Sequence, residues 1–124
     1  MAHDVDLLIV GAGPAGISTA VEARRAGIER ILLLEKGPSH SWSIEKLYTP
    51  GKRVDKVYLG QEVDCEGSVC IMDGTRETAL ATLDAFVAQY DLPIRYATEV
   101  ERIDPLEAGG FLVGDDIKIE LAIE

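Results

Sequence analysis

The sequence predicts an α/β domain built on a central parallel sheet with a crossover helix. Three features predict it: an apolar strand that ends in glycines, a helix that follows them, and a second apolar strand that ends in an acid. They are Leu7–Val10, residues 14–26 and residues 31–35, with the glycines in residues 11–16. This order of parts holds the ADP half of a dinucleotide, so the predicted class is a Rossmann-like FAD/NAD(P)-binding fold.

Each glycine of the turn has a predicted task. Gly11 allows the tight turn off the strand, Gly13 lets the backbone approach a diphosphate, and Gly16 lets the helix lie close against the strand. The start of the helix directs free N–H groups and its positive dipole end at the phosphates. Pro14 suits the first helical turn, where a missing N–H costs nothing. Gly27 is expected to end the helix.

Glu35 follows Gly16 by 19 positions, at the carboxyl end of the second strand. A carboxylate there accepts hydrogen bonds from ribose hydroxyls. It repels a 2′-phosphate, so NADP is disfavoured at this site while FAD and NAD remain. The alternative is that the glycines only form a turn and Glu35 is a solvated strand end.

Length and charge narrow the class further. A chain of 124 residues is expected to form a single domain over residues 1–124. The formal net charge of −10 argues against nucleic acid or an anionic membrane as a partner. Asp4 and Asp6 stand where a signal peptide carries positive charge, and no stretch is long enough to span a bilayer. We therefore expect a cytoplasmic protein.

The later segments are predicted from their periodicity. Short strands are expected at residues 56–59 and 68–72, after a loop at 36–41 and a polar segment at 42–56. An apolar face at three- and four-residue spacing predicts a helix over residues 75–90, capped by Asp73 or Thr75. Residues 94–103 are expected to be the third parallel strand. Two hairpin strands are then expected, at residues 109–113 and 117–123.

The remaining reactive side chains predict neither a catalytic residue nor a metal site. Cys65 and Cys70 are expected to be reduced thiols, because Cys70 falls in a predicted strand and a cytosolic protein keeps its thiols reduced. Two cysteines with distant histidines do not make a zinc site. His40 is expected to face solvent, although its loop position would also suit a flavin-side group. Trp42 and Tyr48 could stack on a ring system, but packing on the domain surface is favoured.

A family resemblance covers most of the chain, and its most specific part is the first thirty-odd residues. The motif Gly-Ala-Gly-Pro-Ala-Gly with Glu35 resembles the start of flavin-dependent pyridine nucleotide-disulfide oxidoreductases, especially the thioredoxin-reductase-like branch. The helix at 75–90, the strand at 94–98 and the hairpin at 111–123 also resemble that branch. The resemblance implies FAD as cofactor and NAD(P)H as co-substrate. The residues it places around FAD are Gly11, Ala12, Gly13, Pro14, Ala15 and Gly16 at the diphosphate, Glu35 at the adenosine ribose, and Lys36 and Val100 beside the adenine.

The chain departs from that family in length. It has no second glycine motif and none of the segments that follow the hairpin in family members, so the resemblance implies a C-terminally truncated piece. Such a piece leaves Leu7–Val10 as an edge strand and predicts weak flavin binding and no activity by itself. The function expected of the parent is an NAD(P)H-dependent flavin oxidoreductase of the disulfide reductase type. The alternatives are a monooxygenase or a catalytically silent nucleotide-binding module, and a homodimer remains open.

Overall fold

A parallel sheet of three strands forms the centre of the domain. The computed structural model describes residues 5–105 and 117–123. Within them β1 (Leu7–Val10), β2 (Ile31–Leu34) and β7 (Ile94–Arg95) lie in the order β1-β2-β7. Leu7 pairs with Ile31, and Leu33 pairs with Ile94, both in parallel register. The predicted parallel sheet is confirmed, and β1 lies at the edge of the described sheet, as expected.

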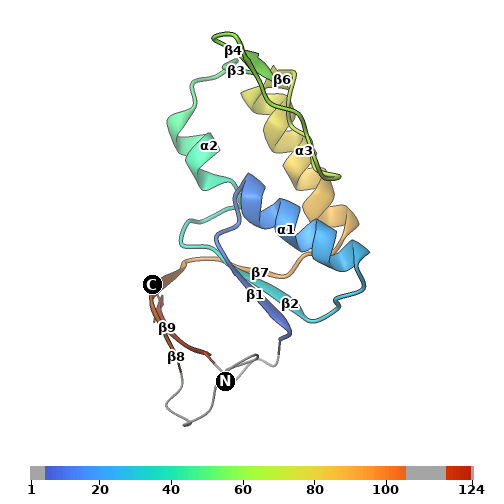
Figure 1. Ribbon diagram of the computed structural model, residues 1–124. Helices are drawn as coiled ribbons and strands as arrows, with labels where there is room; N and C mark the ends of the chain where they lie inside the picture. Colours follow the sequence, from blue (N-terminus) through green and yellow to red (C-terminus); the bar gives the residue numbers. More distant parts are fainter. Residues whose placement is uncertain (1–4, 106–116, 124) are drawn as a thin grey trace.

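Two helices cover one side of this sheet. Helix α1 (Pro14–Arg25) connects β1 to β2, and α3 (Arg76–Gln89) packs beside α1 on the same side (Figure 1). The buried apolar residues that join them to the sheet include Ile9, Ile17, Val21, Leu33 and Leu83. Burial of a branched aliphatic side chain stabilises a fold by about 1.5–3 kcal/mol, so this cluster holds the glycine turn in place.

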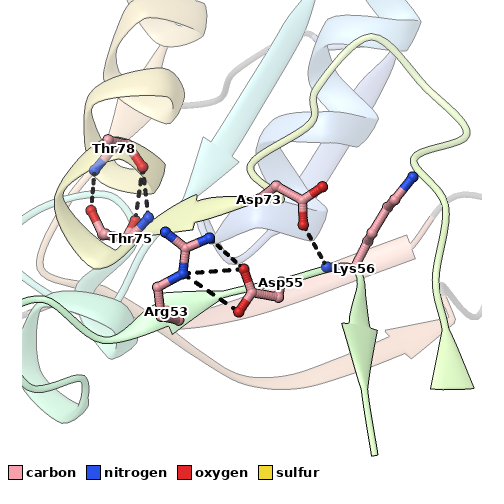
Figure 2. Close-up of polar contacts among 6 residues, drawn as sticks. All are labelled: Arg53, Asp55, Lys56, Asp73, Thr75 and Thr78. Carbon is pink, nitrogen blue, oxygen red and sulfur yellow. Dashed lines mark hydrogen bonds and ion pairs between the residues drawn. The ribbon is translucent and has the colours of Figure 1, made fainter. Parts of the chain in front are cut away.

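The ends of both helices agree with the sequence. Pro14 opens α1, Arg24 and Arg25 lie in its last turn, and Gly27 follows with a φ of 96°. At α3 the cap is Thr75 rather than Asp73. Its hydroxyl accepts from the N–H of Thr78 at 3.3 Å, and the Thr78 hydroxyl accepts from the N–H of Thr75 at 2.8 Å (Figure 2). This reciprocal pair fixes the start of α3.

The segment between β2 and α3 agrees with the prediction only in part, since the strand expected at 56–59 forms over two of those residues. A short helix, α2 (Trp42–Leu47), forms in the segment that the sequence described only as polar. The other elements are two-residue strands: β3 (Arg53–Val54) pairs with β6 (Gly74–Thr75), and β4 (Val57–Tyr58) pairs with β5 (Gln61–Glu62). Polar contacts tie them locally, with Arg53 paired to Asp55 at 2.6 Å and the Lys56 N–H bound to Asp73 at 3.1 Å (Figure 2).

Two predictions for residues 65–72 are wrong. Residues 68–72 form no strand, because Val69 and Ile71 pack against the core from an irregular backbone. Cys65 and Cys70 are joined in a disulfide, with Cα atoms 5.6 Å apart. The expectation of reduced thiols assumed a strand at Cys70, whereas the turn at Gly67 and Ser68 brings the two cysteines to bonding distance.

The predicted third strand divides into two elements. Strand β7 ends at Arg95, and β8 (Thr98–Pro105) leaves the sheet to pair antiparallel with β9 (Ile117–Ile123). Ala97 has a φ of 49°, and this left-handed residue turns the chain between β7 and β8. The β8–β9 pair extends from the side of the sheet away from α1 and α3 (Figure 1). The expected strand at 109–113 lies outside the described residues.

No helix in the described residues has the length and apolar character needed to cross a bilayer.

Candidate functional site

The glycine turn has the geometry that close approach requires. Gly11 has a φ of 102°, and its N–H donates to the Leu34 carbonyl at 2.7 Å, extending the ladder between β1 and β2. A Cβ on Gly16 would overlap the Gly11 carbonyl oxygen, so only glycine lets α1 lie this close to the turn. A Cβ on Gly13 would meet no atom within 4 Å, so this position is open on the side where a ligand would lie.

The start of α1 is free of competing groups. Gly13 is the N-cap residue and contributes no side-chain cap, and the first turn holds no acid. The Gly13 carbonyl accepts the N–H of Ile17 at 2.9 Å, which is the first bond of the helix. The N–H groups of a first helical turn have no partner within the helix, and they carry the positive end of the helix dipole. This helix start therefore suits an anionic group.

Glu35 is built into the same wall. Only 8% of it is exposed, and both carboxylate oxygens accept backbone N–H groups. Oε1 accepts from Ala12 at 2.9 Å, and Oε2 accepts from Gly37 at 2.7 Å. The side chain thus ties the glycine turn to the loop after β2. Each carboxylate oxygen can accept a second hydrogen bond, so a hydroxyl donor can still bind here.

These groups enclose one cavity of about 430 Å³ at the carboxyl ends of β1 and β2. Besides the ends of these two strands, the glycine turn, the loop after β2, the start of α2 and the start of β8 line the cavity. The lining residues are Val10, Gly11, Gly13, Pro14, Leu34, Glu35, Lys36, Ser41, Trp42, Ser43, Ile44, Thr98, Glu99 and Val100. In open α/β sheets ligands bind in the crevice outside the carboxyl ends of the strands, and this cavity occupies that place.

The structure brings most of the predicted site residues to this cavity. Gly11, Gly13, Pro14, Glu35, Lys36 and Val100 line it. Three predicted residues are not among its lining. Ala12 is fully buried behind the turn, Ala15 is exposed on α1, and Gly16 packs against Gly11.

Sequence reasoning missed the contribution of α2. Trp42, at its start, packs on Gly37, where an added Cβ would lie 2.8 Å from the Trp42 side chain. It also lines the cavity and a neighbouring hollow of about 420 Å³ that holds Lys36, Lys46 and Glu99. The favoured expectation of surface packing therefore describes only part of its position. Helix α2 is only 6 residues long, too short to show an apolar face at helical spacing, so no periodic signal could have placed it.

The prediction for His40 is wrong. Only 12% of its side chain is exposed, because it is enclosed between Ser41 and Asp84. Its ring nitrogens lie 3.1 Å from the Ser41 hydroxyl oxygen and 3.0 Å from a carboxylate oxygen of Asp84. No sequence pattern links residues this far apart, since Asp84 comes from α3. Tyr48 packs against the core, and the Lys52 ammonium lies 5.5 Å from its ring centre.

The fold, with its cavity at the carboxyl ends of β1 and β2, is the α/β fold of the Rossmann class. Comparison with known families makes the class specific. The sequence profile of the family described as pyridine nucleotide-disulphide oxidoreductase matches residues 8–119, which is most of the chain. The chain therefore belongs to the pyridine nucleotide-disulphide oxidoreductase family, as its glycine motif and Glu35 had indicated.

Two curated relatives match the chain over a shorter stretch. The alpha subunit of sarcosine oxidase from Corynebacterium sp. (strain U-96) is 37% identical over 59 residues. One subunit of the opine oxidase from Agrobacterium tumefaciens (strain Ach5) is 39% identical over 57 residues. These stretches cover 48% and 46% of this chain, but only 6% and 11% of the two relatives.

Solved structures share the fold over nearly the whole chain. Bacillithiol disulfide reductase Bdr from Staphylococcus aureus superposes with a TM-score of 0.64 at 21% identity, covering 99% of this chain and 35% of that one. OTEMO in complex with FAD and NADP gives 0.67 at 18% identity, covering 100% and 24%. An oxidized steroid monooxygenase bound to NADP gives 0.60 at 26% identity, covering 84% and 21%. The chain thus spans about a third or less of each of these proteins.

Proposed function

We propose that this chain forms the FAD-binding part of an NAD(P)H-dependent flavin oxidoreductase. The observation that carries the proposal is the cavity at the ends of β1 and β2, with the glycine turn on one side and buried Glu35 on the other. The family is FAD-dependent, and OTEMO was crystallised with FAD and NADP. The open Cβ direction at Gly13 and the uncapped start of α1 fit a diphosphate.

The residues divide between the parts of the cofactor. Gly11, Gly13 and Pro14 border the diphosphate, with the N–H groups of the first turn of α1 as donors. Ala12, Ala15 and Gly16 support that turn from behind or from the helix.

Glu35 holds the adenosine ribose, and Lys36 and Val100 border the adenine. When bound, the flavin supplies the hydride chemistry, and the protein supplies position and electrostatics. A carboxylate at Glu35 accepts from ribose hydroxyls and repels a 2′-phosphate, which favours FAD over NADP in this cavity.

Binding is tested by titrating the purified protein with FAD and following the quenching of flavin fluorescence. Gly13→Val is the informative variant, because the extended backbone at Gly13 (φ −89°) accepts any residue and the new side chain would enter open space beside the cavity. We expect it to weaken FAD binding at least tenfold with little change in stability. Ala85→Val places the same valine side chain at an exposed position of α3 and serves as the control. Failure of the wild-type protein to bind FAD would overturn the proposal.

The reaction type is tested on the FAD-loaded protein by adding NADH or NADPH. Within the family assignment we propose a disulfide acceptor, as in the bacillithiol disulfide reductase that shares the fold. Flavin bleaching followed by reoxidation with a disulfide supports this function. A monooxygenase is the second candidate, favoured by the 26% identity to the steroid monooxygenase. Reoxidation of the flavin by oxygen, together with hydroxylation of a substrate or insertion of oxygen into it, would indicate a monooxygenase. FAD that binds but is never reduced would agree with the expectation that this chain binds the cofactor without being active by itself.

A further inference from the structure

A hydrogen-bonded chain of three side chains runs from the cavity wall to the surface. Ser41 lines the cavity, His40 lies behind it, and Asp84 on α3 lies at the outer end. The exposed fraction of the side chain is 12% for His40 and 78% for Asp84. A hollow of about 310 Å³ opens beside His40 and Asp84. The imidazole of His40 is largely buried but does not belong to the hydrophobic core, so packing of the core does not explain its position.

Ser41 lies directly beside the glycine turn. Its N–H donates to the Ala12 carbonyl at 2.8 Å, and it lines the same cavity as Gly11 and Gly13. The residue is 2% exposed and has a left-handed backbone, with φ 56° and ψ 33°. A serine held in this conformation is fixed next to the place where the diphosphate would lie.

Asp84 fixes which nitrogen of His40 carries hydrogen. A carboxylate only accepts hydrogen bonds, so Nε2 must carry a hydrogen to donate to Asp84. In the neutral ring Nδ1 is then bare and accepts the hydroxyl hydrogen of Ser41, whose oxygen keeps only lone pairs for a ligand. In the protonated ring Nδ1–H donates to Ser41 instead, and the hydroxyl hydrogen of Ser41 becomes free to donate.

The hollow beside His40 is lined by acidic and apolar side chains. Asp84 of α3 and Glu45 of α2 line the hollow beside it, and this lining contains no lysine or arginine among the described residues. Burial raises the pKa of the Tyr96 phenol, which receives the backbone N–H of His40, so Tyr96 is neutral and adds no charge beside the imidazole. Of the described residues that line the cavity, Lys36 is the one lysine or arginine, so a second cation near the glycine turn would assist a diphosphate.

We propose that His40, oriented by Asp84, is a positioning residue that makes Ser41 a donor to the cofactor's diphosphate when the imidazole is protonated. This inference rests on the proposed function of the cavity. Binding of the diphosphate then draws one proton from solvent onto Nδ1 of His40, and release of the ligand returns it. The site thereby binds a diphosphate more tightly in its protonated state.

The test is calorimetric titration with ADP-ribose, whose diphosphate does not titrate over the range of about pH 5 to 8 in which histidine changes charge. Repeating it in buffers of different ionisation enthalpy gives the protons taken up per ligand bound. We expect net proton uptake and an affinity that falls as pH rises. His40→Gln removes the titrating ring, so it takes up no proton and its affinity no longer depends on pH. Asp84→Asn removes an anion beside the ring, so the affinity profile shifts toward lower pH.

Ser41→Ala removes the hydroxyl donor and leaves the His40–Asp84 pair in place. At low pH we expect a loss of about tenfold in affinity, the value for one hydrogen bond to a charged group. Ser39→Ala, in the same loop but outside the cavity lining, serves as the control and keeps wild-type affinity.

A second measurement needs no ligand and no variant. Long-range nitrogen–proton NMR spectra of the wild-type protein at high pH report the tautomer of His40, and we expect hydrogen on Nε2. Hydrogen on Nδ1 would overturn the inference. Binding of ADP-ribose without proton uptake would also overturn it and leave the proposed function standing. Absence of both ADP-ribose and FAD binding at every pH would remove the proposed function and the inference together.

Discussion

Residues 7–35 and residues 51–73 belong to one domain but are held by different interactions. In the first segment Ile9, Ile17 and Leu33 are buried in the core, and strand pairing is continuous from β1 to β2. In the second, Tyr58 is 72% and Leu59 is 85% exposed, and the strands are two residues long. A disulfide and single side-chain bonds to backbone fix its shape.

The difference separates the site from its surroundings. The cavity is lined from the first segment and from α2 and β8, while residues 51–73 contribute nothing to its lining. A disturbance of the first segment therefore propagates through the core to the cavity. A disturbance of the second segment should have a more local effect, because Val69 and Ile71 are the residues through which its described part packs against the core.

Gly16→Ala should produce the largest effect, because the added methyl would overlap the Gly11 carbonyl oxygen. Forcing α1 away from the turn should cost about 3 kcal/mol in the free energy of unfolding, at the upper end of overpacking costs. Denaturant unfolding followed by Trp42 fluorescence measures it. Gly13→Ala adds the same methyl in open space and should change stability little. Equal losses in the two variants would contradict the different roles of these glycines.

Glu35→Gln is expected to come next. The amide nitrogen of glutamine cannot accept, so either the Ala12 or the Gly37 N–H loses its partner. An unpaired buried donor costs about 2 kcal/mol, and the turn should loosen with a parallel loss of FAD affinity. Glu99→Gln changes an exposed acid of the same cavity and serves as the control. Unchanged stability in Glu35→Gln would show that the two N–H bonds do not hold the turn.

The structure of residues 7–35 could be predicted because the sequence signals that determine it involve residues close together in the chain. Strand period, glycine turn, helix caps and the position of Glu35 all follow from neighbouring residues, and Pro14 and Gly27 lie where expected. The double acceptor role of Glu35 was not predictable, since it depends on where the turn and the Gly37 loop meet in space.

The second segment was predicted only in part: the strand expected at 56–59 forms as β4, but the one expected at 68–72 does not form. Val69 and Ile71 resemble a strand by composition, but they pair with no strand among the described residues and pack on the core as irregular backbone. The disulfide could not be predicted without knowing that the chain bends at Gly67, between the two cysteines. His40 was expected to face solvent for a similar reason: its partner Asp84 is 44 residues away in the sequence, so their contact could not be foreseen.

Opening the disulfide should have an effect on stability no larger than that of Glu35→Gln. The double variant Cys65→Ser with Cys70→Ser releases a short exposed loop, and we expect a loss of at most about 2 kcal/mol, the chain entropy that the unfolded protein regains when a loop of this length is opened. FAD affinity should stay at the wild-type value. Reduction of the wild-type protein with dithiothreitol should match the variant and serves as its control. A large loss of FAD affinity would show that the two segments are coupled after all.

The smallest effect is expected at Glu22, which connects the two segments. Its Oε1 accepts the Ser68 N–H at 2.8 Å, and this bond, with a smaller contribution from Arg25, holds the pKa of Glu22 below its usual 4.5. A carboxyl with a lowered pKa in the folded state holds its partner at pH values above 4.5 and releases it as the pH falls below the lowered value. The Ser68 amide resonance should therefore move in acid, following the titration of Glu22. Glu22→Gln should shift this resonance at neutral pH without a measurable change in unfolding midpoint, whereas Glu29→Gln, at an exposed position before β2, should leave it in place. If the Ser68 amide resonance shifts neither in acid nor in Glu22→Gln, the disulfide alone positions the loop.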